Sequence, residues 1–259
     1  SAPALYYWCS QHSGMGGAIN TNSTHGSSNF DGAVQSLVSA NSTSGFSVIK
    51  WTSNGSNNDQ LGHGLSGTPK IVLYKRYDST NDWYMWLNGV VDGSQDYIEL
   101  QDTENKVDVG ASYGNHTAST ISNYGYGNGN NLIAYCFEQK IGFSKFGVFH
   151  AGGDDDNSFV YTGFAPQLVV IKPLVSDSWS NWYAFDNVRD KNLNDKPLYW
   201  NLTTQEAYYG GSPATNYAQI DLYSNGFNNQ NINFIKKIKI KNKINVNLEN
   251  DELFEVRIK

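Results

Sequence analysis

The sequence predicts an all-β protein, and three observations support this fold class. Short aromatic and β-branched runs are separated by Gly, Asn and Ser, which is typical of strands joined by turns. No apolar pattern with helical periodicity continues for a dozen residues. One long stretch occurs twice, from Gly45 to Trp86 and again from Gly142 to Phe185. With 14% aromatic and only 16% charged residues, the composition also argues against disorder.

The period of the repeat is about a hundred residues, from Gly45 to Gly142, which exceeds the roughly 20 to 50 residues of a solenoid repeat. We therefore expect two halves of one sandwich or two tandem modules, with repeats at about 45–137 and 142–230. The corresponding positions include a proline, a lysine, a Trp-Tyr pair and a tail, namely Pro69 and Pro166, Lys75 and Lys172, Trp83-Tyr84 and Trp182-Tyr183, and Tyr97-Ile98-Glu99-Leu100 and Tyr199-Trp200-Asn201-Leu202.

The expected elements follow in chain order. A strand over 5–10 precedes a long polar loop over 11–32, and short strands follow at 34–38 and 45–52. The apolar run 70–77 begins after Pro69, which suits the start of a strand because proline lacks the donor, and we expect this strand to be central. It forms a hairpin with 82–87, the run 132–137 closes the first repeat, and 168–173 with 182–185 forms the second hairpin.

The C-terminal segment 231–259 is atypical and predicts an extra β segment. From Ile238 on, apolar residues alternate with lysines and asparagines, the pattern of a strand with one buried and one solvated face. We interpret the basic face as one that blunts a sheet edge, with a phosphate-binding or membrane-binding patch as the alternative. The apolar face would be an assembly strand formed by Ile238, Ile240, Ile244 and Val246.

The charge balance, the N-terminal residues and the cysteines limit the classes of partner and the location that we expect. The net charge is −6, with seven basic and four acidic residues after residue 230, and this balance argues against nucleic-acid binding. The first ten residues lack a basic region and a long apolar run, so we expect no signal peptide, and we expect no membrane insertion. We interpret Cys9 and Cys136 as buried free thiols, and a disulfide between them stays open.

The sequence offers little support for catalysis. The nearest match to a glucanase carboxylate motif, Glu249 to Glu255, has one residue too many, so its last carboxylate would face the wrong side of a strand. The five histidines lie mostly in polar loops, where we expect solvated side chains: His12, His25, His63, His116 and His150. We therefore expect no enzyme.

Two kinds of binding site remain. The loop Asp154, Asp155, Asp156 and Asn157 is rich in the oxygen ligands that calcium prefers, although we favour a solvated acidic turn. Sugar binding would use aromatic rings for stacking, and the richest clusters give Trp83, Trp86, Trp179 and Trp182. Consecutive strand residues point to opposite faces, so one member of each Trp-Tyr pair should be core and the other outward.

Several short motifs are specific when taken together: GFSVIKW, GHGLSGTPKIVLYKR, LIAYCF, GFSKFG, FVYTGFAPQLVVIK and LYSNGF. With them, residues 4–230 resemble concanavalin A-like, lectin-type jelly-roll modules in structural proteins of marine bacteriophages. The resemblance implies a virion-associated, extracellular β-sandwich for host attachment or particle decoration. One departure is that such modules return to a closing aromatic strand after Phe227, whereas this chain continues into its basic tail, which either replaces that strand or pairs with another subunit.

The resulting expectation is a non-enzymatic virion structural protein, a fibre or decoration subunit. Its partners would be a host-surface glycan, other virion subunits or further copies of itself. The alternatives are a free carbohydrate-binding lectin and, with less support, a glycoside hydrolase.

Overall fold

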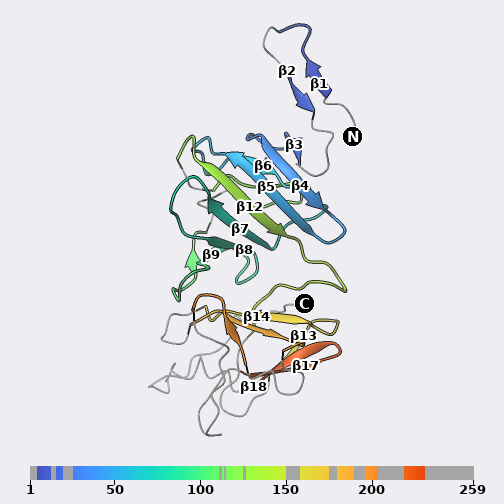
Figure 1. Ribbon diagram of the computed structural model, residues 1–259, viewed down its shortest axis with the longest axis vertical. Coiled ribbons are helices and arrows are strands. Elements are labelled where there is room, and N and C mark those ends of the chain that lie inside the picture. Colours follow the sequence, from blue (N-terminus) through green and yellow to red (C-terminus); the bar gives the residue numbers. More distant parts are fainter. Residues whose placement is uncertain are drawn as a thin grey trace, which may run out of the picture. The chain divides into compact units, whose positions relative to one another are not determined.

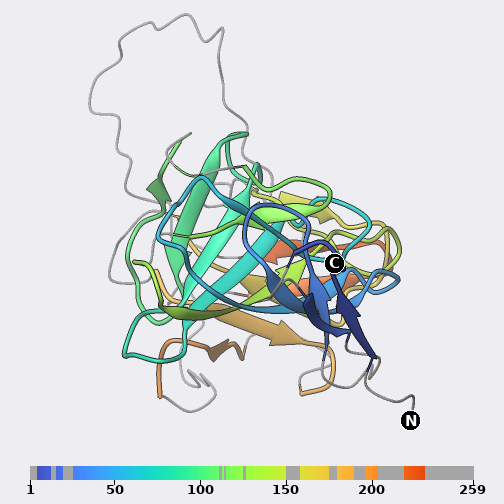
Figure 2. The same cartoon turned by 90° about the horizontal axis from the view of Figure 1, so that it is seen from above.

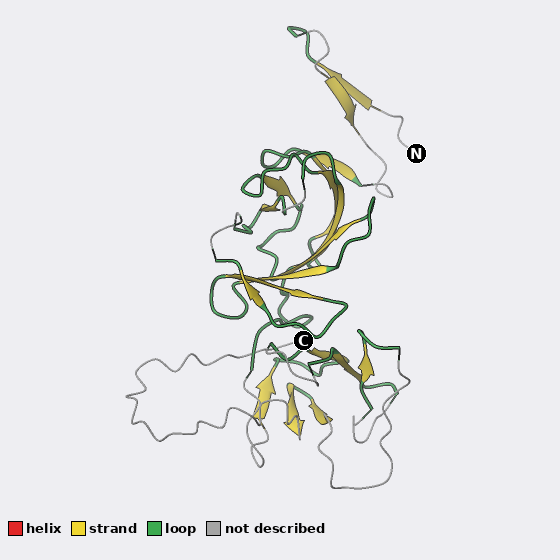
Figure 3. Ribbon diagram, turned by 90° about the vertical axis from the view of Figure 1, so that its left-hand side faces the viewer, coloured by secondary structure: helices red, strands yellow, loops and turns green. Residues whose placement is uncertain are grey.

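The computed structural model describes residues 5–12, 16–19, 26–110, 113, 115–124, 127–149, 158–174, 180–189, 196–203 and 219–230. These residues form strands and loops without a helix, and the strand pairs are antiparallel (Figures 1 and 3). The predicted all-β fold class is therefore confirmed, and the packed antiparallel sheets are those of a β-sandwich protein. The chain divides into two compact units, residues 1–88 with 109–138 and residues 89–108 with 139–259.

The first unit is built on a curved antiparallel sheet with the strand order β8-β7-β12-β5-β4-β3 (Figure 2). Its strands are β3 (Ser27–Asn29), β4 (Ser36–Asn41), β5 (Phe46–Thr52), β7 (Ile71–Arg76), β8 (Tyr84–Asn88) and β12 (Asn131–Phe137). Two short pairs accompany it, β1 (Leu5–Trp8) with β2 (Gly16–Ile19) and β6 (Gln60–Gly62) with β11 (Thr120–Ser122). The predicted central strand is confirmed, because β7 lies between β12 and β8.

Polar side chains on the inner face of this sheet bond to β6, β11 and the residues that follow each of them. Tyr74 Oη donates to Ser122 O at 2.9 Å, and Trp51 Nε1 donates to Asn123 Oδ1 at 2.8 Å. Two buried hydroxyls do the same, with Ser36 Oγ donating to Gly62 O and Ser47 Oγ to His63 O. Around them lies a core that includes Ile49, Leu61, Val72, Ile121 and Leu132. The buried polar groups thus fix the register between the sheet and the short pair without being left unsatisfied.

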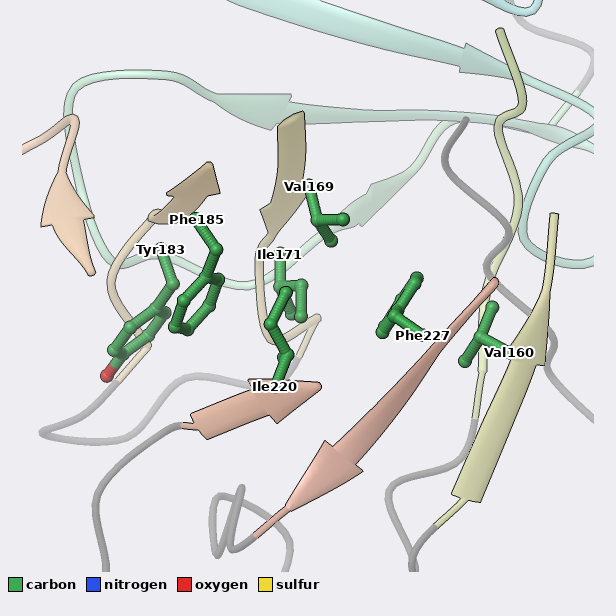
Figure 4. Packing of buried hydrophobic residues seen from close by; sticks show 7 residues of the cluster. All are labelled: Val160, Val169, Ile171, Tyr183, Phe185, Ile220 and Phe227. Carbon is green, nitrogen blue, oxygen red and sulfur yellow. The ribbon is translucent and has the colours of Figure 1, made fainter. Parts of the chain in front are cut away.

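The second unit contains two three-stranded sheets and a short hairpin. The strands are β9 (Gln95–Glu99), β10 (Val107–Asp108), β13 (Ser158–Tyr161), β14 (Leu168–Ile171), β15 (Tyr183–Asp186), β16 (Leu198–Tyr199), β17 (Gln219–Tyr223) and β18 (Gly226–Gln230). One sheet has the order β13-β18-β17 and the other β14-β15-β16. Both contribute to one core, shown in Figure 4: Val160, Val169, Ile171, Tyr183, Phe185, Ile220 and Phe227.

The hairpins β7-β8 and β14-β15 share register and one polar contact. Val72 pairs with Trp86 in the first, and Val169 with Phe185 in the second. In each, the lysine at the repeated position donates to the backbone carbonyl two residues before the Trp-Tyr pair. These bonds run from Lys75 Nζ to Asn81 O and from Lys172 Nζ to Ser180 O. The correspondence read from the sequence therefore extends to hydrogen bonds in these hairpins.

One expectation is wrong in detail, and the two copies of the repeat also differ in one strand. The predicted loop 11–32 contains β2 and β3, which are rich in Gly, Ala, Ser and Asn and lack the apolar alternation that identifies a strand. The repeat of β5 after Gly142 is not a strand, because residues 141–143 form a turn and Phe143 is exposed. No helix among the described residues is long and apolar enough to cross a membrane.

The expected free thiols are confirmed, because neither Cys9 nor Cys136 is in a disulfide. Cys136 is buried in β12, and burial raises the pKa of its thiol. Cys9 is only half-buried, with its Sγ 3.4 Å from His12 Nδ1.

Candidate binding surface

The four tryptophans predicted for sugar binding occupy different environments. Trp86 and Trp182 are only 1% and 3% exposed, so their rings belong to the core. Trp83 is half-buried, and Trp179 lies outside the described residues. Trp182 and Tyr183 are both buried, so the expected division into one core and one outward residue is wrong for that pair. The second unit has two sheets and several loops, and either kind of segment can cover a side chain. Strand alternation alone therefore does not determine which side chains are exposed.

Trp86 belongs to an aromatic cluster inside the first unit. Its ring meets Tyr124 and Tyr113 edge to face, with centroids 4.7 Å and 5.2 Å away. Tyr74 and His116 complete the cluster at 6.2 Å each. Edge-to-face packing of this kind adds to the stabilisation from buried area, and we assign these rings a structural role.

Two of the histidines expected in solvated loops are buried, so that expectation is wrong for them. Tyr74 Oη gives its single proton to Ser122 O, so His116 Nε2, 3.3 Å away, must donate to the Tyr74 oxygen. Burial lowers the pKa of His116 to about 3, so the ring is neutral near pH 7. His63 accepts from the Leu65 amide through Nδ1 and lies 3.2 Å from Thr117 O through Nε2, and burial lowers its pKa too. His25 and His150 lie outside the described residues.

Trp83 lies beside other rings in the first unit. Its ring is nearly parallel to that of Tyr135 at a centroid distance of 6.1 Å, and Tyr135 is in turn nearly parallel to Phe46 at 6.5 Å. Lys75 Nζ lies 5.7 Å from the centre of the Trp83 ring. With neighbours of this kind, Trp83 offers little free ring surface to a ligand.

Among the described residues of the second unit, the half-exposed tryptophan is Trp200, directly after β16. It is 50% exposed, and its ring is nearly parallel to the buried Trp182 ring, with centroids 6.3 Å apart and planes at 17°. The Trp200 amide donates to Trp182 O at 3.2 Å. The buried indole therefore supports the exposed one from behind, and a backbone bond fixes the segment that carries it.

Two asparagines adjoin the two tryptophans in the chain, Asn181 before Trp182 and Asn201 after Trp200. Asn201 Oδ1 accepts from the Trp182 amide at 3.0 Å, and Asn201 Nδ2 donates to Asn181 Oδ1 at 2.9 Å. Each carboxamide carries two N–H donors. Asn201 uses one of its donors in these bonds and Asn181 uses neither, so N–H groups remain on both side chains. Leu198 and Leu202, two residues before and after Trp200, are also exposed. We call Trp200, Asn181, Asn201, Leu198 and Leu202 the Trp200 surface.

Sequence reasoning named the buried ring of this pair and did not name the half-exposed one. It selected Trp182, whose ring supports Trp200 from the core side. A signal was available in the repeat, where Trp200 corresponds to Ile98, a residue that is only 2% exposed. At this position the second copy has a large aromatic residue at the surface, where the first copy has a buried aliphatic residue. This difference distinguishes Trp200.

Three carboxylates of the second unit lie together in and beside β9 and β10. Ligand oxygens of Asp92, Asp96 and Asp108 are within 4.8 Å of one another. Lys106 Nζ donates to Asp92 Oδ2 at 2.8 Å and to Asp96 Oδ1 at 2.6 Å. Hydrogen bonds from Lys106 and Ser94 lower the pKa of Asp92 to about 2, whereas burial raises the pKa of Asp96.

Carboxylates with opposite pKa shifts are also what a glycosidase uses. Asp96, however, is fully buried, and Lys106 bridges it to Asp92. This arrangement does not present an acid and a nucleophile to a substrate, and we interpret it as an ion-pair network.

Other predicted site residues lie outside the described residues. These are the calcium-loop residues Asp154, Asp155, Asp156 and Asn157 and the assembly-strand residues Ile238, Ile240, Ile244 and Val246.

Comparison with known families gives one match. The profile of a domain of unknown function, DUF7483, matches residues 19–238, which is most of the chain. The comparisons with curated proteins and with solved structures give no match.

Proposed function

We propose that this chain, which belongs to the DUF7483 family, is a non-catalytic recognition module of a bacteriophage particle that binds a glycan at the Trp200 surface. The observation that carries the proposal is the half-exposed Trp200 indole held parallel to the buried Trp182 indole. The phage context and the extracellular location rest on the resemblance of residues 4–230 to jelly-roll modules of marine phage structural proteins.

The exposed indole favours recognition because leaving it in water has a cost. Fully burying a large apolar side chain stabilises a protein by about 1.5–3 kcal/mol. Half of the Trp200 side chain is exposed and does not contribute this stabilisation. A ligand that covers the ring recovers it. Since Trp182 and the backbone bond already fix the ring, little side-chain entropy is lost on binding.

The chemistry of the Trp200 surface favours a sugar. The C–H face of a pyranose ring is flat and apolar and matches an indole, while its hydroxyls require donors and acceptors at the edge of the ring. Asn201 follows Trp200 in the chain and bonds to Asn181, so the residues next to the two tryptophans carry amide groups. A few polar groups around an apolar contact area are typical of small-ligand sites.

A glycan screen tests this proposal. The full chain is applied to a glycan array, and the best ligand is then titrated against the wild type and W200A. We expect the substitution to weaken binding by at least about tenfold, as for tryptophans at the centre of interfaces. Y161A is the matched control, since Tyr161 is 51% exposed in β13 of the same unit, and it should bind like the wild type.

The result that contradicts glycan recognition is a wild-type chain that binds no glycan, or a W200A variant that binds as well as Y161A. Melting curves of both variants show whether a loss reflects unfolding. If W200A instead abolishes capture of another particle protein, the same surface serves assembly.

The proposal includes self-association through the alternating C-terminal segment, supported by its sequence pattern alone. Light scattering on the full chain and on a chain ending at Gln230 measures this. We expect an oligomer that becomes a monomer on truncation, and two monomers would contradict an assembly strand.

A further inference from the structure

The strand β14 is paired along one edge only within the described part of the chain. Its counterpart in the first unit, β7, lies between β8 and β12, whereas β14 lies beside β15 at the end of its sheet. The Asn187 amide donates to Gln167 O, which makes these two residues a hydrogen-bonded pair next to the β14-β15 ladder. By antiparallel alternation, the backbone N–H and C=O groups of Leu168 and Val170 point away from β15. The second unit thus has an open edge where the first unit has its closing strand β12.

The N-terminal strand β1 has the sequence of such a closing strand. The run LYYWC of residues 5–9 matches LIAYC of residues 132–136, with a leucine, an aromatic residue and a cysteine in the same places. Both runs are apolar throughout, which is typical of a central strand that is covered on both faces. The C-terminal segment 231–259 differs, because lysines and asparagines occupy alternate positions from Ile238 on. Of the two ends of the chain, β1 therefore fits the open edge better.

The strand β1 lies in a hairpin that has an edge to offer. It pairs with β2 in a two-stranded sheet of its own (Figure 1), and a hairpin of this size is marginally stable alone. The strand β2 is antiparallel to β1, as β5 is antiparallel to β12. A hairpin that docks beside β14 would give the strand order β15-β14-β1-β2, which reproduces the order β8-β7-β12-β5 of the first unit.

The side chains that would face each other compensate in size. In the first unit the large Tyr74 lies opposite the small Ala134, and both are buried. The corresponding residues are Ile171 and Tyr7, so the smaller side chain belongs to the accepting strand and the larger one to the hairpin. Tyr7 is 46% exposed. Docking would cover this ring and remove apolar surface from water.

We propose that β14 of one copy of this chain accepts the β1-β2 hairpin of a second copy by strand addition. A second copy is the occupant because the hairpin contacts its own first unit, where Tyr7 meets Phe30 edge to face at 6.5 Å. Each copy has one hairpin and one β14 edge, so the contact is heterologous and joins copies head to tail. A strand of four residues buries little area, and the association is therefore weak. It does not depend on glycan binding or on the C-terminal segment.

Disulfide trapping between β1 and β14 tests this contact. Cys136 lies opposite Val72 in the first unit, and the same register places Cys9 of one copy opposite Val169 of the next. This pair is of the non-hydrogen-bonded kind, whose Cα atoms lie about 4.5 Å apart, within the reach of a disulfide. In V169C, oxidised glutathione should join the Cys9 thiol to the introduced thiol and leave two molecules of reduced glutathione. We expect a ladder of linked chains on a non-reducing gel that grows with protein concentration.

The matched control is V170C, because consecutive strand residues point to opposite faces and its thiol would face away from Cys9. It should give at most about a tenth of the linked chains. The ladder should persist in a chain ending at Gln230, which stays monomeric at the dilute concentrations of light scattering. This persistence separates the contact from association through the C-terminal segment.

Two results would overturn the proposal. One is a V169C variant that forms no more linked chains than V170C, and the other is a disulfide that closes within a single chain. Melting curves under reducing conditions show whether V169C is folded. Y7C/I171C in a C9S background tests the neighbouring pair of the same register, so an unfolded V169C does not leave the question open.

Discussion

Two glycines with nearly the same backbone conformation differ in what surrounds them. Gly32 has φ = 87° and Gly129 has φ = 85°, values that disfavour any residue with a Cβ. A Cβ on Gly32 would lie 2.3 Å from the backbone oxygen of Gln60, whereas a Cβ on Gly129 would have nothing within 4 Å. Substitutions at these two glycines therefore separate the cost of backbone strain from the cost of a steric clash.

We expect G129A to lower the free energy of unfolding by about 1–2 kcal/mol, the usual cost of the left-handed conformation for a non-glycine residue. G32A should cost clearly more, because the Gln60 backbone, which also pairs with β11 and accepts from the Val34 amide, would have to move. Urea denaturation of both variants measures the difference. Equal losses would show that the Gln60 backbone gives way easily.

At the same scale, the sequence could identify residue types but not their exposure. It placed aromatic candidates in both repeats, yet Trp86 and Trp182 are core residues and Trp200 is the half-exposed one. It also expected solvated histidines, whereas His63 and His116 are held by contacts with residues distant in the chain. Exposure depends on which segments cover a strand, and this information is not local.

At the scale of elements, strands rich in apolar residues could be predicted and short polar ones could not. The runs 45–52, 70–77 and 132–137 correspond closely to β5, β7 and β12, since aromatic and β-branched residues are dense there. The strands β2, β3, β6 and β11 have three or four residues each and are held by backbone pairing with few apolar side chains. Such pairing leaves little trace in residue patterns.

Internal repetition was a better guide to the hairpins than to the rest of the repeat. The equal register of β7-β8 and β14-β15 follows the matched residues. The segment after Gly142 also matches its counterpart, but it does not form a strand. Identical residues keep a local hairpin because both partners are repeated, whereas a single strand also needs neighbours to pair with.

At the scale of the whole molecule, the buried histidines make stability depend on pH. The pKa of His116 is about 3 in the folded chain, against about 6.5 when unfolded. Between these values the unfolded chain binds the extra proton, so stability falls as the pH falls below 6.5. His63 acts in the same direction.

We expect a loss of about 1.4 kcal/mol between pH 7.5 and 5.5 from His116 alone. Denaturant titrations across this range measure it, and H116Q should lack this loss, with a slope smaller by about half a proton on average over the range. In NMR spectra of the wild type, the His116 ring signals should stay constant from pH 8 to 4.5. A ring that titrates near pH 6.5 would contradict the neutral, buried assignment.

The matched lysine bonds of the two hairpins show what the two copies of the repeat share, and a second position shows where they differ. Lys75 and Lys172 hold the same turn of the backbone in both copies, while the repeat-equivalent position carries Ile98 in one copy and Trp200 in the other. One copy thus has a buried aliphatic side chain at a position where the other has a half-exposed aromatic ring, although the same lysine bond holds the backbone of both hairpins. Exchange of that single side chain would alter the exposed surface of one copy without removing either lysine bond.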